Sequence, residues 1–292
     1  MAKRLILSLI ACAAMAGVGS QALSSSQQIP VPPADPALTA AVAAPTRTPA
    51  NVARDRYRNP AATLSFFGVK PNHTVVEIWP GGGWYTEILA PYLAGGGGKL
   101  YLAAPGWGRS GIDKLKAANP ALYGSLTVAD FPVFDGKPAE VPASSADAVL
   151  TFRNVHNWKM GYRRDDKADY SLDAFRQIYA MLKPGGVLGI EDHRLPESAD
   201  AEREKTSGYI KVSTVRALAE QAGFRFAGSS EINANPKDTA DWPNGVWTLP
   251  PSLRNGEVDR AKYIAIGESD RMTLKFVKPA TASAAPKVER GR

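Results

Sequence analysis

Two periods of apolar residues alternate along the middle of this chain. Short apolar runs, which are typical of buried strands, are separated by stretches in which apolar residues recur every three or four positions, as on one face of a helix. The runs that predict strands are Thr74–Ile78, Lys99–Ala103, Leu126–Ala129, Ala148–Phe152, Val187–Glu191, Phe224–Ile232 and Arg271–Val277. The stretches that predict helices are Leu64–Phe67, Trp84–Leu93, Ile112–Ala118, Leu172–Leu182 and Ser213–Ala222. This order predicts an α/β fold, Rossmann-like and doubly wound, with a mainly parallel sheet covered by helices on both faces.

The first residues of the chain predict export. Residues 1–22 read as a signal peptide, with Lys3 and Arg4 ahead of an apolar run and a small-residue cleavage site ending at Ala22. The protein is therefore expected to be periplasmic or secreted. The segment Leu9–Cys12 also resembles a bacterial lipobox, in which case Cys12 would carry a lipid. The apolar run is shorter than the roughly 20 residues that span a bilayer, so no stable membrane span is expected.

The remaining boundaries follow from composition. Residues 23–51 and 279–292 are rich in Ala, Pro, Ser and Thr and contain few large apolar residues, which predicts a disordered linker and a disordered tail. The folded domain is expected over 52–278. Within it, residues 233–267 form a loop-rich insertion that includes Trp residues and prolines, and long loops in compact domains are often functional.

Composition and charge exclude several classes of function. Cys12 is the only cysteine of the 292 residues, so cleavage after Ala22 leaves no thiol for catalysis, disulfides or thiolate metal sites. The net charge is +7, and +5 once Lys3 and Arg4 are removed, with basic residues scattered among acids. Nucleic-acid binding needs a basic face, so no nucleic-acid partner is expected. The sequence indicates no particular oligomeric state.

A glycine corner follows the first predicted strand. Glu77 is followed by Trp79 and by the run Gly81–Gly83, and the next helix is expected to begin near Trp84. Glycines allow a tight turn and a close approach of a ligand, and a helix N-terminus attracts anionic groups. The corner is therefore interpreted as a ligand-binding site, with a plain structural turn as the alternative.

Further motifs follow the other predicted strands in order. They are Asp130 after the third strand, Asn154–Trp158 after the fourth, Lys183–Gly186 before the fifth, and Gln221–Phe224 and Asp270–Phe276 near the end of the domain. This set resembles the class I S-adenosylmethionine-dependent methyltransferases. More narrowly, the Arg-Asn-Pro, Phe-Phe-Gly, Pro-Gly-Gly-Gly-Trp-Tyr-Thr-Glu and Glu-Ser-Asp-Arg patterns resemble those of predicted methyltransferases exported by Gram-negative bacteria. The resemblance covers residues 52–278 and implies a seven-stranded sheet with a terminal antiparallel strand.

The resemblance also implies S-adenosylmethionine as cofactor and a set of residues that hold it. The amino acid end of the cofactor is expected at the corner, and its adenine beside Asp130 and Phe131. The expected cofactor-binding residues are Glu77, Trp79, Gly81, Gly82, Gly83, Asp130, Phe131 and Asn154.

This chain departs from the family pattern at two positions. Trp79 stands where members usually have glycine, and the second strand ends in Ala103–Pro105 without the usual ribose-binding acid. The loss of that acid is expected to weaken cofactor binding by roughly 10- to 100-fold, since a hydrogen bond to a charged group contributes about 1.5–3 kcal/mol.

Candidate catalytic groups follow the fourth and fifth strands. His156 follows the fourth strand, and Asp192 and His193 follow the fifth, which is its neighbour in a doubly wound sheet. Both imidazoles are therefore expected to face one cleft as proton acceptors. As an alternative, the histidines are surface residues or hydrogen-bonded filler, and Glu191 and Asp192 cap a helix or form ion pairs. A further alternative is a metal site made of His156, Asp192 and His193. No metal is expected, because the ligand spacing is not compact.

Trp158, Tyr162 and Arg194 are the candidate walls of the substrate pocket, with ordinary packing as the alternative. The expected function is transfer of a methyl group from S-adenosylmethionine to a small-molecule acceptor. The alternatives are an exported, non-catalytic ligand-binding module on the same fold and, less favoured, a metal-dependent hydrolase. The insertion, with Trp242, Trp247 and Pro250–Pro251, is expected to form part of a lid over the acceptor.

Overall fold

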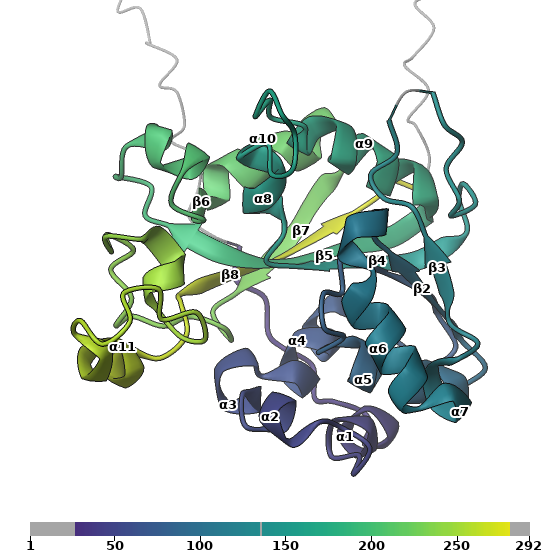
Figure 1. The fold of residues 1–292 in the computed structure, drawn as a ribbon. Helices are drawn as coiled ribbons and strands as arrows, with labels where there is room; N and C mark the ends of the chain where they lie inside the picture. Colours follow the sequence, from purple (N-terminus) through teal and green to yellow (C-terminus); the bar gives the residue numbers. More distant parts are fainter. Residues whose placement is uncertain (1–26, 135, 281–292) are drawn as a thin grey trace, which may run out of the picture.

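A twisted mixed sheet forms the centre of the computed structural model, which describes residues 27–134 and 136–280 (Figure 1). Its strands are β1 (Thr74–Ile78), β2 (Lys99–Ala103), β3 (Thr127–Ala129), β4 (Ala146–Phe152), β5 (Leu182–Leu195), β6 (Ile210–Lys211), β7 (Arg225–Ser230) and β8 (Arg271–Val277). The order is β3-β2-β1-β4-β5-β8-β7, with the short β6 paired to the end of β5. Strands β1 to β5 are parallel, whereas β8 runs antiparallel to both β5 and β7. The predicted fold class, including the terminal antiparallel strand, is confirmed.

Helices cover both faces of this sheet. On one face, α9 (Ser171–Met181) and α10 (Val212–Gln221) pack in a core cluster that contains Phe175 and Val215. On the other face, α4 (Pro60–Phe67), α5 (Thr86–Gly95) and α6 (Ser110–Ala118) enclose a second cluster around Leu64 and Ile88. The shorter elements are α7 (Pro120–Tyr123), α8 (Val155–Lys159), α11 (Arg260–Ile266), η1 (Gly106–Gly108), η2 (Ala201–Lys205) and η3 (Gly245–Thr248).

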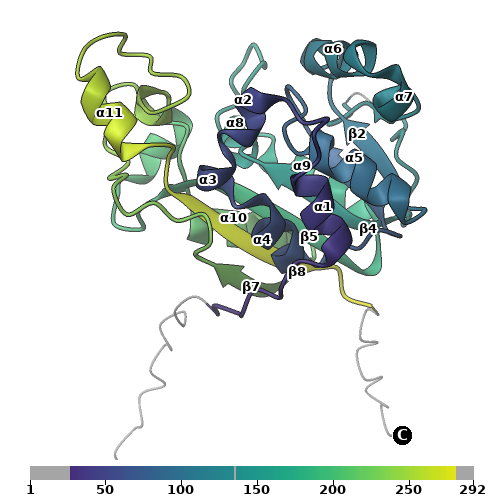
Figure 2. The same ribbon diagram turned by 90° about the horizontal axis from the view of Figure 1, so that it is seen from below.

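The predicted disordered linker is wrong from residue 27 onward. The chain forms α1 (Pro36–Val42), α2 (Pro49–Val52) and α3 (Asp55–Arg58), which lie across the lower face of the sheet with α4 (Figure 2). Asp35 caps α1 by accepting a 2.8 Å hydrogen bond from the Leu38 N–H, and Pro36 occupies the first helical position. Leu38 is buried in the second core cluster. The segment is ordered because it docks on the domain, and its composition does not reveal this docking.

Strand β5 is longer than the run that predicted it. It continues through Asp192 and His193, which pair with Met272 and Arg271 of β8, and its last two residues pair with β6. Successive residues of a strand point to opposite sides of the sheet. The extended strand therefore holds several polar side chains rigidly at the edge of the sheet where β4 ends.

The insertion after β7 contains η3 and α11 and lies beyond the end of β5, with α11 at the left in Figure 1. The Asp238 carboxylate fixes it by accepting hydrogen bonds from the Tyr209 hydroxyl, the Trp242 indole N–H and the Asp270 N–H. The expected signal peptide, the lipobox at Cys12 and most of the predicted tail lie outside the described residues. No helix in the described part of the chain is long and apolar enough to cross a bilayer.

Candidate active site

The carboxyl ends of the parallel strands meet at one edge of the sheet, where ligands bind in folds of this kind. Two cavities lie along that edge. One, of about 490 Å³, lies beyond β1, β2 and β3, and five of its eleven lining residues are aromatic. The other, of about 280 Å³, lies beyond β4 and β5 and is lined by histidines, arginines and part of the insertion. We call them the aromatic cavity and the cationic cavity.

The structure brings the three predicted catalytic residues together beside the cationic cavity. His156 Nδ1 lies 2.7 Å from Asp192 Oδ1, and the rings of His156 and His193 are 5.0 Å apart between centroids. Both histidines line the cavity, while Asp192 is fully buried behind them. Because the Asp192 carboxylate accepts a hydrogen bond from the Nδ1–H of His156, the proton stays on Nδ1 and Nε2 is left as the basic atom of that imidazole.

Asp192 also caps α8, as one of the alternative interpretations predicted. Its Oδ2 accepts hydrogen bonds from the Val155 N–H at 2.7 Å and the His156 N–H at 3.3 Å. Its Oδ1 accepts from the His193 N–H at 2.7 Å. A carboxylate at a helix N-terminus satisfies free N–H groups and interacts favourably with the helix dipole. These bonds hold α8, and with it the His156 side chain, in one orientation.

His193 is held neutral. Its Nδ1 lies 2.5 Å from the Ser269 Oγ. Burial lowers the pKa of His193 well below its usual value, and the neighbouring His156, Arg153 and Arg271 lower it further. The ligand atoms of His156, Asp192 and His193 lie within 4.8 Å of one another. However, each Asp192 oxygen already accepts two hydrogen bonds, and nearby arginines oppose a cation, so the geometry argues against the metal interpretation.

A buried ionic cluster surrounds these histidines, and it confirms the alternative in which Glu191 forms ion pairs, although its partners were not predicted. Glu191 accepts hydrogen bonds from Arg153 at 3.0 Å and from Arg271 at 2.8 Å, and Arg271 also donates to Glu268 at 3.0 Å. Burial raises the pKa of the Glu268 carboxyl, but Arg271 and Arg58 outweigh it and hold that pKa at about 2. Arg58, Glu268 and Arg271 belong to motifs that resemble those of a family, and the resemblance gives them no role. Their position beside apolar runs is the one sequence signal that they could be buried and paired.

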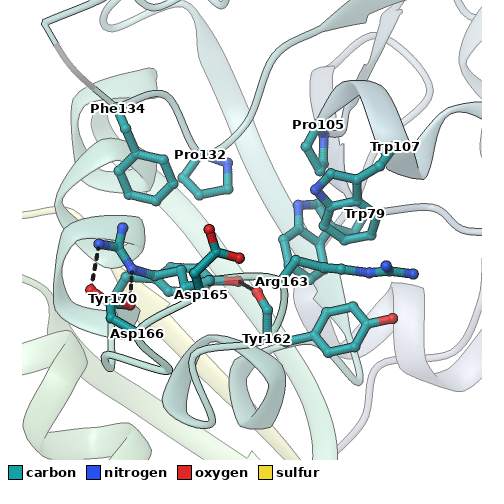
Figure 3. Close-up of a pocket in the computed structure, with 11 residues that line it drawn as sticks. Trp79, Pro105, Trp107, Pro132, Phe134, Tyr162, Arg163, Asp165, Asp166 and Tyr170 are labelled. Carbon is teal, nitrogen blue, oxygen red and sulfur yellow. Dashed lines mark hydrogen bonds and ion pairs between the residues drawn. The ribbon is translucent and has the colours of Figure 1, made fainter.

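The aromatic cavity lies between two groups of rings (Figure 3). Trp79 and Trp107 lie on one side with their rings 5.1 Å apart, and Pro132 and Phe134 lie on the other. Tyr162, which was predicted as a wall of the substrate pocket, lines this cavity and not the cationic one. The other lining residues are Pro105, Arg163, Arg164, Asp165, Asp166 and Tyr170. Its volume is within the usual range for ligand pockets, about 300–1,000 Å³. Flat aromatic walls suit a planar ring system such as adenine.

Trp79 is held in a strained conformation. Its φ of 47° is in the left-handed region, which favours glycine and is rarely adopted by a bulky residue. The indole N–H donates a 2.9 Å hydrogen bond to the Phe131 carbonyl oxygen, and the ring also packs against Trp158. Trp79 therefore forms a wall of the aromatic cavity, where the family pattern has no side chain.

The other residues of the glycine corner have different positions. Gly81 and Gly83 adopt positive φ angles of 58° and 82°, and the helix begins at Thr86 rather than near Trp84. A Cβ on Gly111 of α6 would overlap the Gly81 carbonyl oxygen, so α6 packs directly on the turn. Gly82 is exposed in the same turn.

Four further expected cofactor residues are fixed by hydrogen bonds or packing. Glu77 is buried and accepts a 2.6 Å hydrogen bond from the Thr86 hydroxyl. Asn154 donates to the Ile78 carbonyl oxygen and so ties the ends of β1 and β4 together. Phe131 is fully buried. Asp130 is partly exposed at the end of β3, where its Oδ1 pairs with Arg109 at 2.5 Å.

No carboxylate from β2 reaches the place expected for a ribose. Instead, Arg109 donates from Nε to the Ala104 carbonyl oxygen and pairs with Asp130. Two acidic residues, Asp165 and Asp166, line the aromatic cavity itself, and Asp130 lies two positions before its wall residue Pro132.

Two predicted substrate residues do not line either cavity. Trp158 is 0% exposed and packs in the core against Trp79, Phe131 and Phe175, because the turn of α8 that presents His156 to the cleft directs it inward. Arg194 points elsewhere and pairs with Glu231 and Asp270, which raise its pKa against the effect of burial.

Comparisons with known proteins agree with the fold. No protein-family model matches this chain, and no curated protein does. It is similar to the structure of an S-adenosylmethionine-dependent methyltransferase from Aquifex aeolicus, with 17% identity over 77% of this chain and 93% of that one and a TM-score of 0.50. A proposed sarcosine dimethylglycine methyltransferase from Galdieria sulphuraria has 15% identity over 79% and 86% of the two chains, with a TM-score of 0.52.

The chain has the fold of the S-adenosylmethionine-dependent methyltransferases. The [4+2]-cyclase SpnF has that fold too, with 13% identity to this chain over 77% and 82% of the two chains and a TM-score of 0.51. The fold therefore supports more than one kind of chemistry, and the activity has to be argued from the site.

Because Glu77 is buried, we expect the free energy of unfolding of this protein to depend on pH. Burial raises the pKa of Glu77 to about 7 from an ordinary value of 4.5. A raised native pKa gives stability that is present below the unfolded pKa and lost as pH rises through the native one. Relative to Glu77→Gln, the wild type should lose up to about 3 kcal/mol of unfolding free energy between pH 4.5 and pH 8. Urea denaturation followed by tryptophan fluorescence at several pH values measures this, and a pH-independent difference would contradict it.

Proposed function

We propose that this protein is a methyltransferase that uses S-adenosylmethionine and acts on a small-molecule acceptor. The pairing of His156 with Asp192 at the ends of neighbouring strands carries this proposal, because it places an oriented base beside the cleft of a methyltransferase fold. S-adenosylmethionine supplies an electrophilic methyl group when it is bound.

The residues at the ends of β1 to β3 fit the cofactor in part. The walls formed by Trp79, Trp107 and Phe134 suit its adenine. Asp130, just after β3, is the carboxylate that we assign to the ribose hydroxyls in place of the missing acid of β2, and its pairing with Arg109 lowers its freedom to turn toward them. Asp165 and Asp166 are further carboxylates in the walls of the cavity. These features support binding with reduced affinity.

The residues at the ends of β4 and β5 act on the acceptor. His156 Nε2 would accept the proton that the acceptor loses, and the resulting imidazolium would be stabilised by the Asp192 carboxylate at Nδ1. His193 lines the cavity beside His156, and its lowered pKa keeps it from adding a positive charge there. The chain's contribution is thus to orient the acceptor and to remove its proton.

The insertion supports the lid that the sequence predicted. Trp247, Pro250 and Pro251 line the cationic cavity together with the histidines. Trp242 does not, because its ring packs against Tyr263 and its indole N–H bonds to Asp238. The insertion would exclude water from the acceptor side of the cleft.

His156→Asn should lower the rate of methyl transfer by about 10²- to 10⁴-fold, the usual contribution of a positioned base. The measurement is transfer of a labelled methyl group from S-adenosylmethionine into fractionated small-molecule extracts. His73→Asn is the matched control, since His73 lies ahead of β1 at the opposite edge of the sheet, and it should retain full activity.

Two results would contradict this account. Equal turnover by His156→Asn and the wild type would remove the proposed base. Bound cofactor with no transfer in any fraction would favour the non-catalytic binding module instead.

We also propose that the protein is exported. This rests on residues 1–22, and cleavage after Ala22 would remove no residue of the described fold. Mass spectrometry of the protein from the periplasm or medium of a Gram-negative host should find a mature chain that begins at Leu23. A chain that begins at a lipid-modified Cys12 would indicate the lipoprotein alternative, and an uncleaved cytoplasmic chain would contradict export.

A further inference from the structure

The cationic cavity contains a buried positive charge that the proposed methyl transfer does not itself explain. Its walls include three arginines from two separate parts of the chain, two histidines and one tryptophan of the insertion: Arg54, Arg58, Arg153, His156, His193 and Trp247. Arg58 ends α3 and Arg54 is its N-cap residue, both just inside the predicted start of the folded domain at residue 52. The docking of α3 therefore completes the cavity.

The charges in and around this cavity do not balance. Glu268 accepts hydrogen bonds from Arg54 at 2.6 Å, from Arg58 at 3.2 Å and from Arg271 at 3.0 Å. Glu191 is shared by Arg153 and Arg271. Four guanidinium groups thus share two carboxylates, which leaves an excess of two positive charges. If the carboxylate of Asp192, which lies behind His156, is included, an excess of one positive charge remains.

Donor groups remain available in the cavity. Arg54 and Arg58 each bond to Glu268 through Nε, and no hydrogen bond among the described residues uses their terminal nitrogens. A guanidinium has five N–H donors and commonly binds an oxyanion through two of them. Burial, and then the positive charge of Arg153, lower the pKa of Arg58 to about 9, although Glu268 opposes this.

The remaining walls set the size and shape of the ligand. The volume of about 280 Å³ is just below the usual range for ligand pockets, about 300–1,000 Å³, so the ligand is small. Trp247, stacked under Arg254 at 4.6 Å, provides a flat apolar wall, and His156 adjoins the arginines. A ligand here can place an anionic group on the arginines, an apolar body against Trp247 and a reacting atom at His156.

We propose that the cationic cavity binds a small oxyanion group, a carboxylate or a phosphate, carried by the methyl acceptor. This assignment rests on the proposed function and specifies the acceptor as a small anionic molecule. The arginines hold its anionic group by charge-assisted hydrogen bonds, which are about twice as strong as neutral ones. The methyl-accepting atom is then presented to His156.

Histidine NMR of the mature chain tests this without S-adenosylmethionine. The chain has three histidines, of which His156 and His193 line the cavity and His73 serves as an internal control. Titration with inorganic phosphate and, separately, with benzoate should shift the C2-proton signals of the two cavity histidines saturably and leave that of His73 in place. The tighter probe identifies the oxyanion as phosphate or carboxylate.

Arg54→Gln should weaken the binding of the preferred probe by about tenfold or more, since a charge-assisted hydrogen bond is lost. Arg54 is 27% exposed and Glu268 keeps two other partners, so this variant is expected to fold. Arg56→Gln is the matched control, because Arg56 is on the same helix, stacks on Tyr57 and does not line the cavity. Its affinity for the probe should equal that of the wild type.

Three results would overturn the proposal. They are the absence of histidine shifts with either probe, equal affinity in Arg54→Gln and Arg56→Gln, and displacement of the probe by the demethylated cofactor, which would assign the cavity to the cofactor's own carboxylate. A failure of S-adenosylmethionine to bind would remove the proposed function while leaving this titration as a separate result.

Discussion

The carboxylate of Asp192 is the interaction on which the cleft depends. It is fully buried, and four hydrogen bonds from the backbone of α8, from His193 and from the His156 imidazole converge on it. Charge-assisted bonds of this kind contribute about 1.5–3 kcal/mol each. Without this carboxylate, α8 would lose its N-terminal cap and His156 would lose the partner that sets its tautomer. The geometry of the base, and the inward packing of Trp158 on the same short helix, both follow from it.

The neighbouring residue, Glu191, organises the other side of β5 in the same way. Side chains of successive strand residues point to opposite faces, so adjacent acids hold two different structures. Glu191 anchors Arg153 and Arg271, and Arg271 in turn reaches Glu268, which collects Arg54 and Arg58. The side chains at this edge of the sheet therefore form two chemically different groups. Aromatic side chains lie beyond β1 to β3, and histidines and arginines lie beyond β4 and β5, so the two halves suit two different ligand parts.

Much of this fold is readable from the order of apolar runs, because buried parallel strands leave strong local patterns. Three strands, β1, β2 and β8, have the predicted bounds. The meeting of His156 with Asp192 and His193 was predictable too, since neighbouring parallel strands end at one edge. The pattern could not show that β5 continues to Leu195, because the residues beyond Glu191 are polar and gain their stability from pairing with β8 and β6.

Other features depend on contacts between distant segments. The order of residues 27–51 comes from Leu38 and Ala41 docking on the core, while the local composition is that of a linker. Arg194 was expected in the cleft, but its ion pairs with Glu231 and Asp270 direct it away. The cationic cavity combines α3, the ends of β4 and β5 and the insertion, and its residues have no shared local pattern.

The most direct test of the central claim is a calorimetric titration of the chain from Leu23 onward with S-adenosylmethionine and with its demethylated product. A shorter chain that begins at Asn51 would lack α1 and the start of α2, so the ordered N-terminal segment has to be included. The account predicts saturable binding of both compounds in the micromolar range, weakened but not abolished by Trp79 and by the missing acid of β2. No heat at millimolar ligand, from a sample shown to be folded, would contradict it.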